Sequence, residues 1–314
     1  MRVLQLGDTH LGIARRAWGA PPGWTRAQDH ATALAAALSP ERLDRVDLVV
    51  HTGDVFDRSR PPADAVAAAR TLLHRAARQV PVVVLAGNHD RRGLGHSLGS
   101  SGGDLHIVSQ PRRLTIGGLD LALVPHARQA ADWARAAAAI DAGAADVVVT
   151  HQGVTGARVP GFTFRPGAPT ETLAPHHLPP GTRLVWSGHL HPHQRVALGD
   201  ARVVYAGSTA ATSGSEAGQA KGVVEWDLTG APSSRFCPLP GRLVVRVAAP
   251  DQLDRVRAGA WVGVPANRLR ELGPAVVARG GIVALPSSSP RRDRRQLGLF
   301  DRVGQSARSP AGRR

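Results

Sequence analysis

The chain has 314 residues, a formal net charge of +15 at pH 7 and a single cysteine, Cys237. One cysteine excludes a disulfide framework, no apolar run reaches the roughly 18 residues that a membrane span needs, and the start MRVLQLGD turns polar too early for a signal peptide. We therefore expect a cytoplasmic protein with no membrane partner, long enough to bury a full core in one large domain with or without an appendage.

Short apolar runs alternate with alanine-rich helical stretches through the first two thirds of the chain. The runs predicted to be buried strands are residues 2–6, 47–50, 81–86, 146–150 and 183–187. Helices are predicted at residues 25–43, 62–79 and 127–143. After Leu190 the pattern changes to hairpins, with a turn at Gly199 and Asp200 and a further strand at residues 222–228. This order predicts an α/β fold built from layers of sheets and helices.

Two stretches, residues 91–103 and 152–182, lack hydrophobic periodicity and are rich in Gly, Ser or Pro. Loops of this length inside a domain are usually functional or mobile. Beyond the main domain, predicted at residues 1–238, the pattern indicates a small α/β cap at residues 239–286. Residues 287–314 consist mostly of Ser, Pro, Arg and Gly, which predicts a disordered basic tail.

Each of the five predicted buried strands is followed by a polar cluster of the same kind. The clusters are GDTH (Asp8, His10), GDVFDR (Asp54, Asp57, Arg58), GNHD (Asn88, His89, Asp90), THQG (His151) and SGHLH (His189, His191). In open α/β sheets ligands bind beyond the carboxyl ends of the strands, so we expect these groups to meet in one crevice. Mixed Asp, Asn and His ligands suit divalent ions such as Mn, Fe or Zn. A dinuclear centre with a bridging carboxylate is suited to phosphoester displacement.

This ordered set of clusters resembles the calcineurin-like metallophosphoesterase superfamily over roughly residues 1–230. The resemblance implies a four-layer αββα sandwich with two divalent metal ions. It implies that one ion is held by Asp8, His10, Asp54 and His191, and the other by Asp54, Asn88, His151 and His189, with Asp54 bridging. His89 would be catalytic, because it matches a histidine that protonates the leaving oxygen or stabilises the developing charge.

Within the superfamily, the blocks DTHLG, GDVFD, GNHD and GHLHPHQRV, followed by VVYAGS, resemble the bacterial SbcD-type DNA-repair exonucleases. That resemblance implies a nuclease that uses Mn, with Mg, Fe and Zn as other candidate ions, and that works with an SMC-like ATPase. The chain departs from this pattern in two ways. Only about 45 residues separate the main domain from the tail, where the family continues into a larger cap and an ATPase-binding helical segment, and the block VTHQG is no clear family match.

The basic residues favour a nucleic acid as partner. All of the 39 basic residues except Lys221 are arginines, whose planar guanidinium matches phosphate, although genome base composition also enriches Arg and Ala. Arg158 and Arg165 accompany two phenylalanines in the 152–182 stretch, which suits stacking on DNA or merely a local apolar cluster. Arg58 either contacts substrate phosphate or pairs with Asp57.

Two alternatives to a DNA nuclease stay open. The first is a phosphatase or phosphodiesterase for a small substrate, which would use the same two metals. The second, from another class, is a non-catalytic factor that tethers DNA or a clamp. The complete set of predicted ligands and His89 argues against the second. Among the other histidines, we expect His30 to be a surface or packing residue and His51 to be structural.

The predicted tail contains one apolar cluster, QLGLF, in which Gln296, Leu297, Leu299 and Phe300 stand without a core to join. It resembles the pentapeptide by which bacterial replication and repair proteins bind the sliding clamp, and that resemblance implies the clamp as a partner. The alternative is a chance apolar cluster in a tail that binds only DNA.

Overall fold

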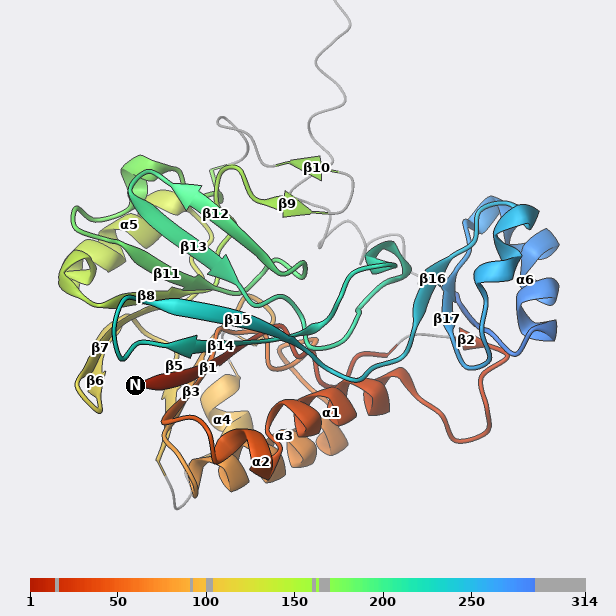
Figure 1. Ribbon diagram of the computed structural model, residues 1–314, viewed down its shortest axis with the longest axis horizontal. Coiled ribbons are helices and arrows are strands. Elements are labelled where there is room, and N and C mark those ends of the chain that lie inside the picture. The colour runs from red at the N-terminus through yellow and green to blue at the C-terminus, as the bar shows by residue number, and fades with distance from the viewer. Residues whose placement is uncertain (15–16, 91–92, 100–103, 160–161, 164–169, 286–314) are drawn as a thin grey trace, which may run out of the picture.

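The computed structural model describes residues 1–14, 17–90, 93–99, 104–159, 162–163 and 170–285. Two six-stranded sheets form its larger part, with helices on their outer faces, and a smaller unit that contains α6 lies to one side (Figure 1). Among the described residues, no helix has both the length and the apolar character needed to cross a membrane.

The first sheet combines strands from the N-terminal third of the chain with a hairpin from residues 222–238. Its order is β15 (Ser233–Pro238), β14 (Gly222–Asp227), β1 (Arg2–Leu6), β3 (Leu48–His51), β4 (Val82–Leu85) and β5 (Leu105–Val108). Strands β1, β3, β4 and β5 are parallel, whereas β14 is antiparallel to β1 and β15 to β14. The carboxyl ends of the four parallel strands therefore lie at one edge.

The second sheet has the same design. Its order is β12 (Gln194–Leu198), β13 (Ala201–Tyr205), β11 (Leu184–Ser187), β8 (Val147–Thr150), β7 (Leu119–Val124) and β6 (Arg112–Ile116). The inner strands β13, β11, β8 and β7 are parallel, and the outer strands β12 and β6 are antiparallel to their neighbours. The five strands predicted from apolar runs are confirmed as β1, β3, β4, β8 and β11, with ends shifted by up to one residue.

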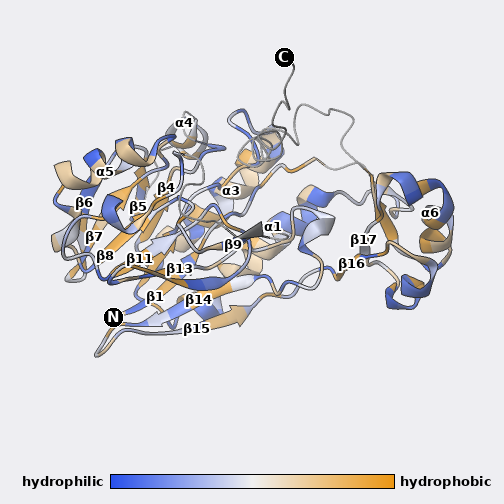
Figure 2. Cartoon of the chain, turned by 90° about the horizontal axis from the view of Figure 1, so that it is seen from above, coloured by the Kyte–Doolittle hydropathy of each residue, from blue (hydrophilic) through white to orange (hydrophobic). Residues whose placement is uncertain are grey.

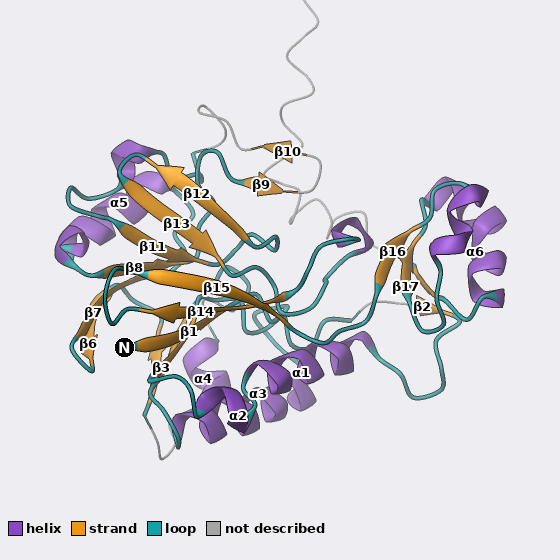
Figure 3. Ribbon diagram, in the orientation of Figure 1, coloured by secondary structure: helices purple, strands orange, loops and turns teal. Residues whose placement is uncertain are grey.

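Helices cover the outer faces of both sheets (Figure 3). The helices are α1 (Arg26–Ala37), α2 (Pro40–Leu43), α3 (Ala63–Ala77) and α4 (Leu94–Leu98) on the first sheet and α5 (Ala130–Ala139) on the second. On the first sheet Leu34 and Leu73 pack with Val49, and on the second Trp133 packs with Val148. The predicted four-layer αββα arrangement is confirmed.

Between the sheets lies a third cluster, in which Val3 and Leu48 of the first sheet pack with Val149 and Trp186 of the second. Because alternate residues of each inner strand face this cluster and the helices, both faces are buried and the strands are continuously apolar. The hydrophobic colour in Figure 2 runs along β8 and β11 for this reason. One polar residue in this layer, Gln5, satisfies its amide by bonding the carbonyl of Val204 and the indole of Trp226, both at 2.9 Å.

The smaller unit has a four-stranded sheet and its own core around Val245, Val262 and Val276. Its order is β16 (Val244–Arg246), β17 (Trp261–Gly263), β18 (Ile282–Ala284) and β2 (Ala17–Trp18), with α6 (Leu269–Ala278) packed against it. Strand β2 comes from the N-terminal region and pairs antiparallel with β18. The indole of Trp18 covers Gly273 of α6 so closely that a Cβ there would lie 2.4 Å from its ring.

Some elements differ from the sequence prediction. The helix predicted at residues 25–43 is two helices, because Pro40 disfavours a helical Ser39 and begins α2 instead. Strands β5, β6, β7 and β15 and helix α4 lie where no element was predicted. Two further strands, β9 (Arg158–Val159) and β10 (Phe162–Thr163), form a short hairpin. The 3-10 turns are Ala142–Ala144, Pro175–His177, Gly214–Glu216, Pro250–Arg255 and Ala266–Arg268.

Candidate metal centre

The polar clusters predicted from the strand ends come together where the carboxyl ends of the two sheets meet. Strands β1, β3 and β4 deliver Asp8, His10, Asp54, Asn88 and His89, and strands β8 and β11 deliver His151, His189 and His191. Three overlapping sets have ligand atoms within 4.8 Å of one another among the described residues: Asp8, His10, His191; His10, Asp54, His89; and Asp8, Asp54, His151.

A first donor group consists of Asp8, His10 and His191. The Nε2 atoms of His10 and His191 lie 3.1 Å apart, and Asp8 and His10 are almost fully buried. Nδ1 of His10 is buried and has no hydrogen-bond partner in the part of the chain that the structure describes. Imidazole nitrogens and a carboxylate that converge in a buried place fit the ligand set of a divalent ion such as Mn, Fe or Zn.

A second donor group consists of Asn88, His151 and His189. The Oδ1 atom of Asn88 lies 3.1 Å from Nε2 of His151 and 3.0 Å from Nδ1 of His189. The ring of His151 is held by its other nitrogen, since Nδ1 donates to the carbonyl of Thr52 at 2.8 Å. A metal-binding histidine is oriented in this way by its second ring nitrogen, so this group also fits a divalent ion.

Asp54 lies between the two donor groups. Its Oδ2 atom is 3.4 Å from Nε2 of His151 and 3.8 Å from Nε2 of His10, while its Oδ1 accepts the main-chain N–H of His89 at 2.9 Å. Burial alone would raise the pKa of Asp54, but the imidazoles of His151, His89 and His10 hold it well below its ordinary value. Burial likewise opposes the charge on His151, yet Asp54 raises the pKa of that imidazole to about 9.

Backbone strain is concentrated at this site. Five non-glycine residues in the described part of the chain have positive φ, and four of them are predicted ligands: Asp8 (50°), His10 (44°), Asp54 (55°) and His189 (85°). Such conformations cost of order 1–3 kcal/mol each and persist where the surrounding structure holds them for a purpose. The strain marks a functional site at the same residues as the sequence motifs.

Steric crowding explains why the GD and GN motifs have glycine at their first position. A Cβ on Gly53 would lie 2.4 Å from Nδ1 of His151, and a Cβ on Gly87 would lie 2.1 Å from Oδ1 of Asp54. Both positions let a ligand side chain pass directly over the main chain. The last residue of GNHD ties two of these loops together, because the carboxylate of Asp90 accepts the main-chain N–H groups of Val55 at 2.6 Å and Gly87 at 2.8 Å.

His89 lies at the edge of the centre. Its Nδ1 donates to the carbonyl of Asp57 at 2.6 Å, and its Nε2 lies 3.9 Å from Oδ2 of Asp54. The ring meets that of His10 edge to face at 5.0 Å, and its side chain is 20% exposed, in contrast to the buried Asp54. His89 can therefore reach both the donor groups and a molecule that enters from solvent.

The predicted substrate-binding arginines are less clearly placed. Arg58 donates to the carbonyl of Gly12 at 3.4 Å, and its Nε is buried without a partner among the described residues. Arg158 is exposed at the start of β9, where its main-chain N–H and carbonyl both bond the side chain of Gln194. Arg165 and the tail residues Gln296, Leu297, Leu299 and Phe300 lie outside the described residues.

Two residues near the centre were missed by the sequence analysis. His126 follows β7, its Nδ1 donates to the carbonyl of His151 at 3.0 Å, and its ring lies 5.7 Å from that of His189. The run LALVPH would have revealed it as a sixth strand-end histidine, had β7 been predicted. Glu216 contacts His191 from a later loop, and no strand-end pattern points to it.

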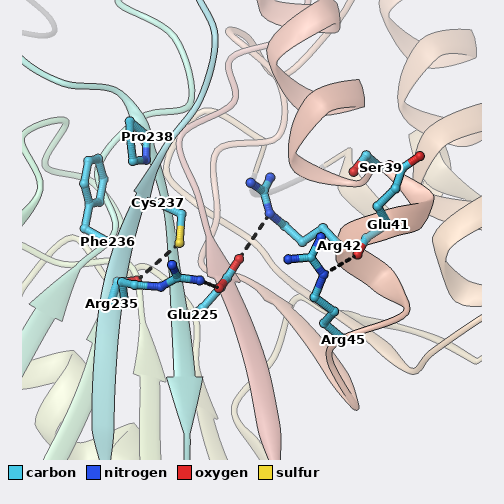
Figure 4. Close-up of a pocket in the computed structure, with 9 residues that line it drawn as sticks. All are labelled: Ser39, Glu41, Arg42, Arg45, Glu225, Arg235, Phe236, Cys237 and Pro238. Atoms are coloured by element: carbon cyan, nitrogen blue, oxygen red, sulfur yellow. Dashed lines mark hydrogen bonds and ion pairs between the residues drawn. The ribbon is translucent and has the colours of Figure 1, made fainter.

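Another concave region lies along the β14–β15 edge of the first sheet (Figure 4). This pocket has a volume of about 270 Å³ and is lined by arginines and carboxylates from α2 and the hairpin. Glu225 pairs with Arg42 at 3.3 Å and with Arg235 at 2.7 Å. Because Glu225 pairs with two of the three lining arginines, and the third, Arg45, donates to the carbonyl of Glu41 at 2.9 Å, the pocket is not a strong phosphate site and we assign it no role.

Residues 1–193 match the calcineurin-like phosphoesterase family, and the chain belongs to that family, as the motifs predicted. Among its curated relatives it is similar to the SbcD subunit of the nuclease SbcCD of Rhodobacter capsulatus, with 28% identity over 289 residues that cover 76% of this chain and 69% of that protein. The Bacillus subtilis protein of the same name is 28% identical over 269 residues, covering 71% and 65%. The DNA double-strand break repair protein Mre11 of Sulfurisphaera tokodaii is 33% identical over 90 residues, covering 28% and 22%.

Proposed function

We propose that this phosphoesterase is a two-metal DNA phosphodiesterase, an exonuclease or endonuclease of DNA repair or recombination. The observation that carries the proposal is the position of Asp54, whose Oδ2 faces histidine nitrogens of both donor groups at 3.4 and 3.8 Å. The relatives named for nuclease and double-strand break repair functions support a DNA substrate. We assign the reaction to residues 1–238, with residues 239–286 as a cap.

In this proposal the first donor group and Asp54 hold one ion, and the second donor group and Asp54 hold the other. Two such ions would activate water as the nucleophile and offset the charge on the phosphodiester. We propose Mn as the native metal, because the donors mix imidazole, amide and carboxylate. The Nδ1 bond of His89 to the carbonyl of Asp57 fixes the direction of the ring, and in its doubly protonated form the ring would donate the Nε2 proton to the leaving oxygen.

The choice of DNA over a small phosphoester rests on charge. The net charge of +15 comes almost wholly from arginine, and arginines on a protein surface bind the phosphates of a nucleic acid without reading its sequence. We propose Arg58, Arg158 and Arg165 as phosphate contacts. A small-substrate phosphodiesterase remains the second candidate, because the metal centre alone does not distinguish the two.

A single assay tests this proposal. Purified protein, stripped of metal and reloaded with Mn, Mg or nothing, is incubated with end-labelled linear DNA, hairpin DNA and a chromogenic phosphodiester. We expect cleavage of DNA in Mn and none without metal. Cleavage of the chromogenic compound alone would favour the small-substrate enzyme, and no hydrolysis of either with any metal would favour the non-catalytic tethering factor.

We further propose that the tail brings the enzyme to the bacterial sliding clamp. The sequence QLGLF at residues 296–300 supports this, with Gln296 as the polar contact and Leu297, Leu299 and Phe300 as apolar anchors. The SMC-like ATPase that the nuclease resemblance implies is a separate expectation, and a co-purification experiment tests it.

A further inference from the structure

The loop of residues 208–216 connects the metal centre to the smaller unit. Glu216, at its end, is only 4% exposed. One carboxylate oxygen, Oε1, lies 3.1 Å from Nδ1 of His191 and accepts the main-chain N–H of Thr212 at 3.2 Å. The other, Oε2, is paired with Lys221 at 2.5 Å. The only lysine of the chain thus balances a buried carboxylate directly behind a predicted metal ligand.

This contact determines which nitrogen of His191 faces the centre. Because Nδ1 donates its proton to Glu216, the neutral ring of His191 has its free lone pair on Nε2, which lies 3.1 Å from Nε2 of His10. A carboxylate behind a histidine fixes its tautomer and ring direction and strengthens it as a ligand, and its loss typically weakens metal binding 10- to 100-fold. Lys221 also donates to the carbonyl of His191 at 3.2 Å, which holds the main chain of the same residue.

Helix α1 contacts the same loop. The carbonyl of Ala211 accepts from Nη2 of Arg26 and lies 3.3 Å from Nε2 of His30. His30 is fully buried, and its Nδ1 bonds the carbonyl of Thr9, between the predicted ligands Asp8 and His10, at 2.8 Å. Helix α1 therefore contacts the main chain on both sides of the first donor group.

The smaller unit in turn contacts residues of helix α1. The guanidinium of Arg26 lies 4.0 Å from the ring centre of Trp261 in β17. Arg242, which leads into β16, pairs with Asp29 at 2.9 Å, and Asp29 pairs with Arg26 at 2.6 Å. This chain of charges and one aromatic ring, in which Arg26 and Trp261 are buried and Asp29 and Arg242 are partly buried, couples the smaller unit to α1.

The loop and the smaller unit also touch directly through two glycines. A Cβ on Gly214 would lie 2.8 Å from Cα of Gly263, and a Cβ on Gly263 would lie 3.0 Å from Cα of Gly214. Neither glycine has a positive φ, so an alanine at either position costs no backbone strain of its own. The added Cβ must instead push the loop and strand β17 apart.

We propose that Glu216 is a positioning residue for His191 and that the smaller unit, by docking on the 208–216 loop, sets the affinity of the first metal position. This inference rests on the metal centre of the proposed function. It makes the smaller unit part of the catalytic machinery, since a displacement of β17 reaches His191 through Gly214 and Glu216. The second donor group has no such connection among the described contacts.

The test is a Mn²⁺ titration of the metal-free full chain by calorimetry, with electron paramagnetic resonance to count bound ions. For Glu216→Gln, Gly263→Ala and Gly214→Ala we expect one ion to bind at least 10-fold more weakly and the other within about 2-fold of wild type. Gly230→Ala is the matched control, because a Cβ there meets nothing within 4 Å. Unchanged affinity in both glycine variants would overturn the docking role, and unchanged affinity in Glu216→Gln would overturn the positioning role.

Because Gly263 lies in β17, a second variant is needed to separate a loss of docking from a local distortion of that strand. Arg242→Gln removes the ion pair with Asp29 and the bond from Nη1 to the carbonyl of Gly259, but it changes no residue of the loop or of β17, and it should weaken the same ion in the same direction. Failure of the proposed function looks different: wild-type protein would then bind no Mn²⁺ pair, or Asp54→Asn would leave both ions in place. Equal weakening of both ions in Gly263→Ala would indicate a general loss of structure and contradict the inference.

Discussion

The Oδ2 atom of Asp54 lies 3.4 Å from Nε2 of His151, and the two buried groups hold each other charged. A divalent ion bound between them would replace the proton on His151 as the partner of this carboxylate. Asp54→Asn removes the charge that faces both donor groups, so we expect hydrolysis to be abolished and bound metal to fall, measured by elemental analysis. Asp132→Asn, a change at an exposed residue of α5, is the control, and full activity of Asp54→Asn would refute a dinuclear centre.

His89 should act on the reaction rather than on the metals. We expect His89→Ala to retain metal content and DNA affinity but to lower turnover by about 10²- to 10⁴-fold, the usual effect of a positioned acid. Turnover is measured at saturating DNA, and metal content on the same sample. Loss of metal would show that His89 is a ligand, as its position 3.9 Å from Asp54 also permits.

His51 provides a test of stability against pH. Its Nδ1 accepts the main-chain N–H of Gly53 at 3.2 Å and its Nε2 lies 3.0 Å from the hydroxyl of Thr9, a pattern that only the neutral ring satisfies. Burial, together with the charge of His151, lowers the pKa of His51 from 6.5 to about 3. Between these values the unfolded chain binds one more proton, so stability falls by about 1.4 kcal/mol per pH unit as the pH decreases.

We expect His51→Gln to be less stable than wild type at pH 7.5 but to lose less stability between pH 6.5 and 4. Urea denaturation of metal-free protein across this range measures both effects, with His74→Gln on α3 as a control for the loss of a histidine. An unchanged pH slope in His51→Gln would show that other groups cause the acid sensitivity.

Binding to DNA should weaken steeply with salt, because arginines displace counterions from phosphates. Fluorescence anisotropy with a labelled duplex in EDTA, which prevents cleavage, measures the affinity between 50 and 200 mM salt. For 6 to 10 phosphate contacts the loss is about 10³- to 10⁵-fold. A flat response would favour the enzyme for a small substrate.

The proposed clamp contact can be tested apart from the enzyme. Residues 291–314 contain eight Arg and two Asp, and Leu297, Leu299 and Phe300 are the apolar side chains offered to the clamp. Burying each contributes roughly 1.5–3 kcal/mol, and ordering the segment takes back several kcal/mol, so we expect micromolar affinity, about 8 kcal/mol.

A peptide spanning residues 289–304 should bind purified bacterial clamp, as measured by calorimetry. The double change Leu299→Ala and Phe300→Ala should abolish that binding and, in the full chain, leave cleavage of short DNA unchanged. Equal binding by the changed peptide would rule the motif out and leave DNA as the partner of the tail.

The parts of the fold predicted from sequence are those with a strong local signal. Strands such as β8 are buried on both faces and therefore read as continuous apolar runs, and each is followed by motif residues. Strands β5 to β7 escaped prediction because their segment mixes charged and apolar residues: Arg112 and Arg113 lie in the edge strand β6, which has one face in solvent. His126 was missed with them.

In the candidate site, too, the residues with a strong local sequence signal were predicted and those without one were not. Its ligands follow strands and carry glycine motifs, so their convergence was predictable from the rule for parallel sheets. Glu216 and Arg26 were not, because their contacts join segments separated by 25 residues or more and depend on how the smaller unit docks. His30 was expected at the surface or in packing, and it is buried against the main chain between two predicted ligands.

Because strand β2 belongs to the sheet of the smaller unit, the folding of that unit depends on the order in which the chain is synthesised. Ala17 and Trp18 leave the ribosome more than 260 residues before their partners Ala284 and Val283. Until then the indole of Trp18 lacks the helix that it covers at Gly273. The two six-stranded sheets and their helices can assemble first, and the smaller unit closes only when nearly all of the described chain is present. A fragment that begins after β2 would therefore expose the edge of β18 and the uncovered face of α6.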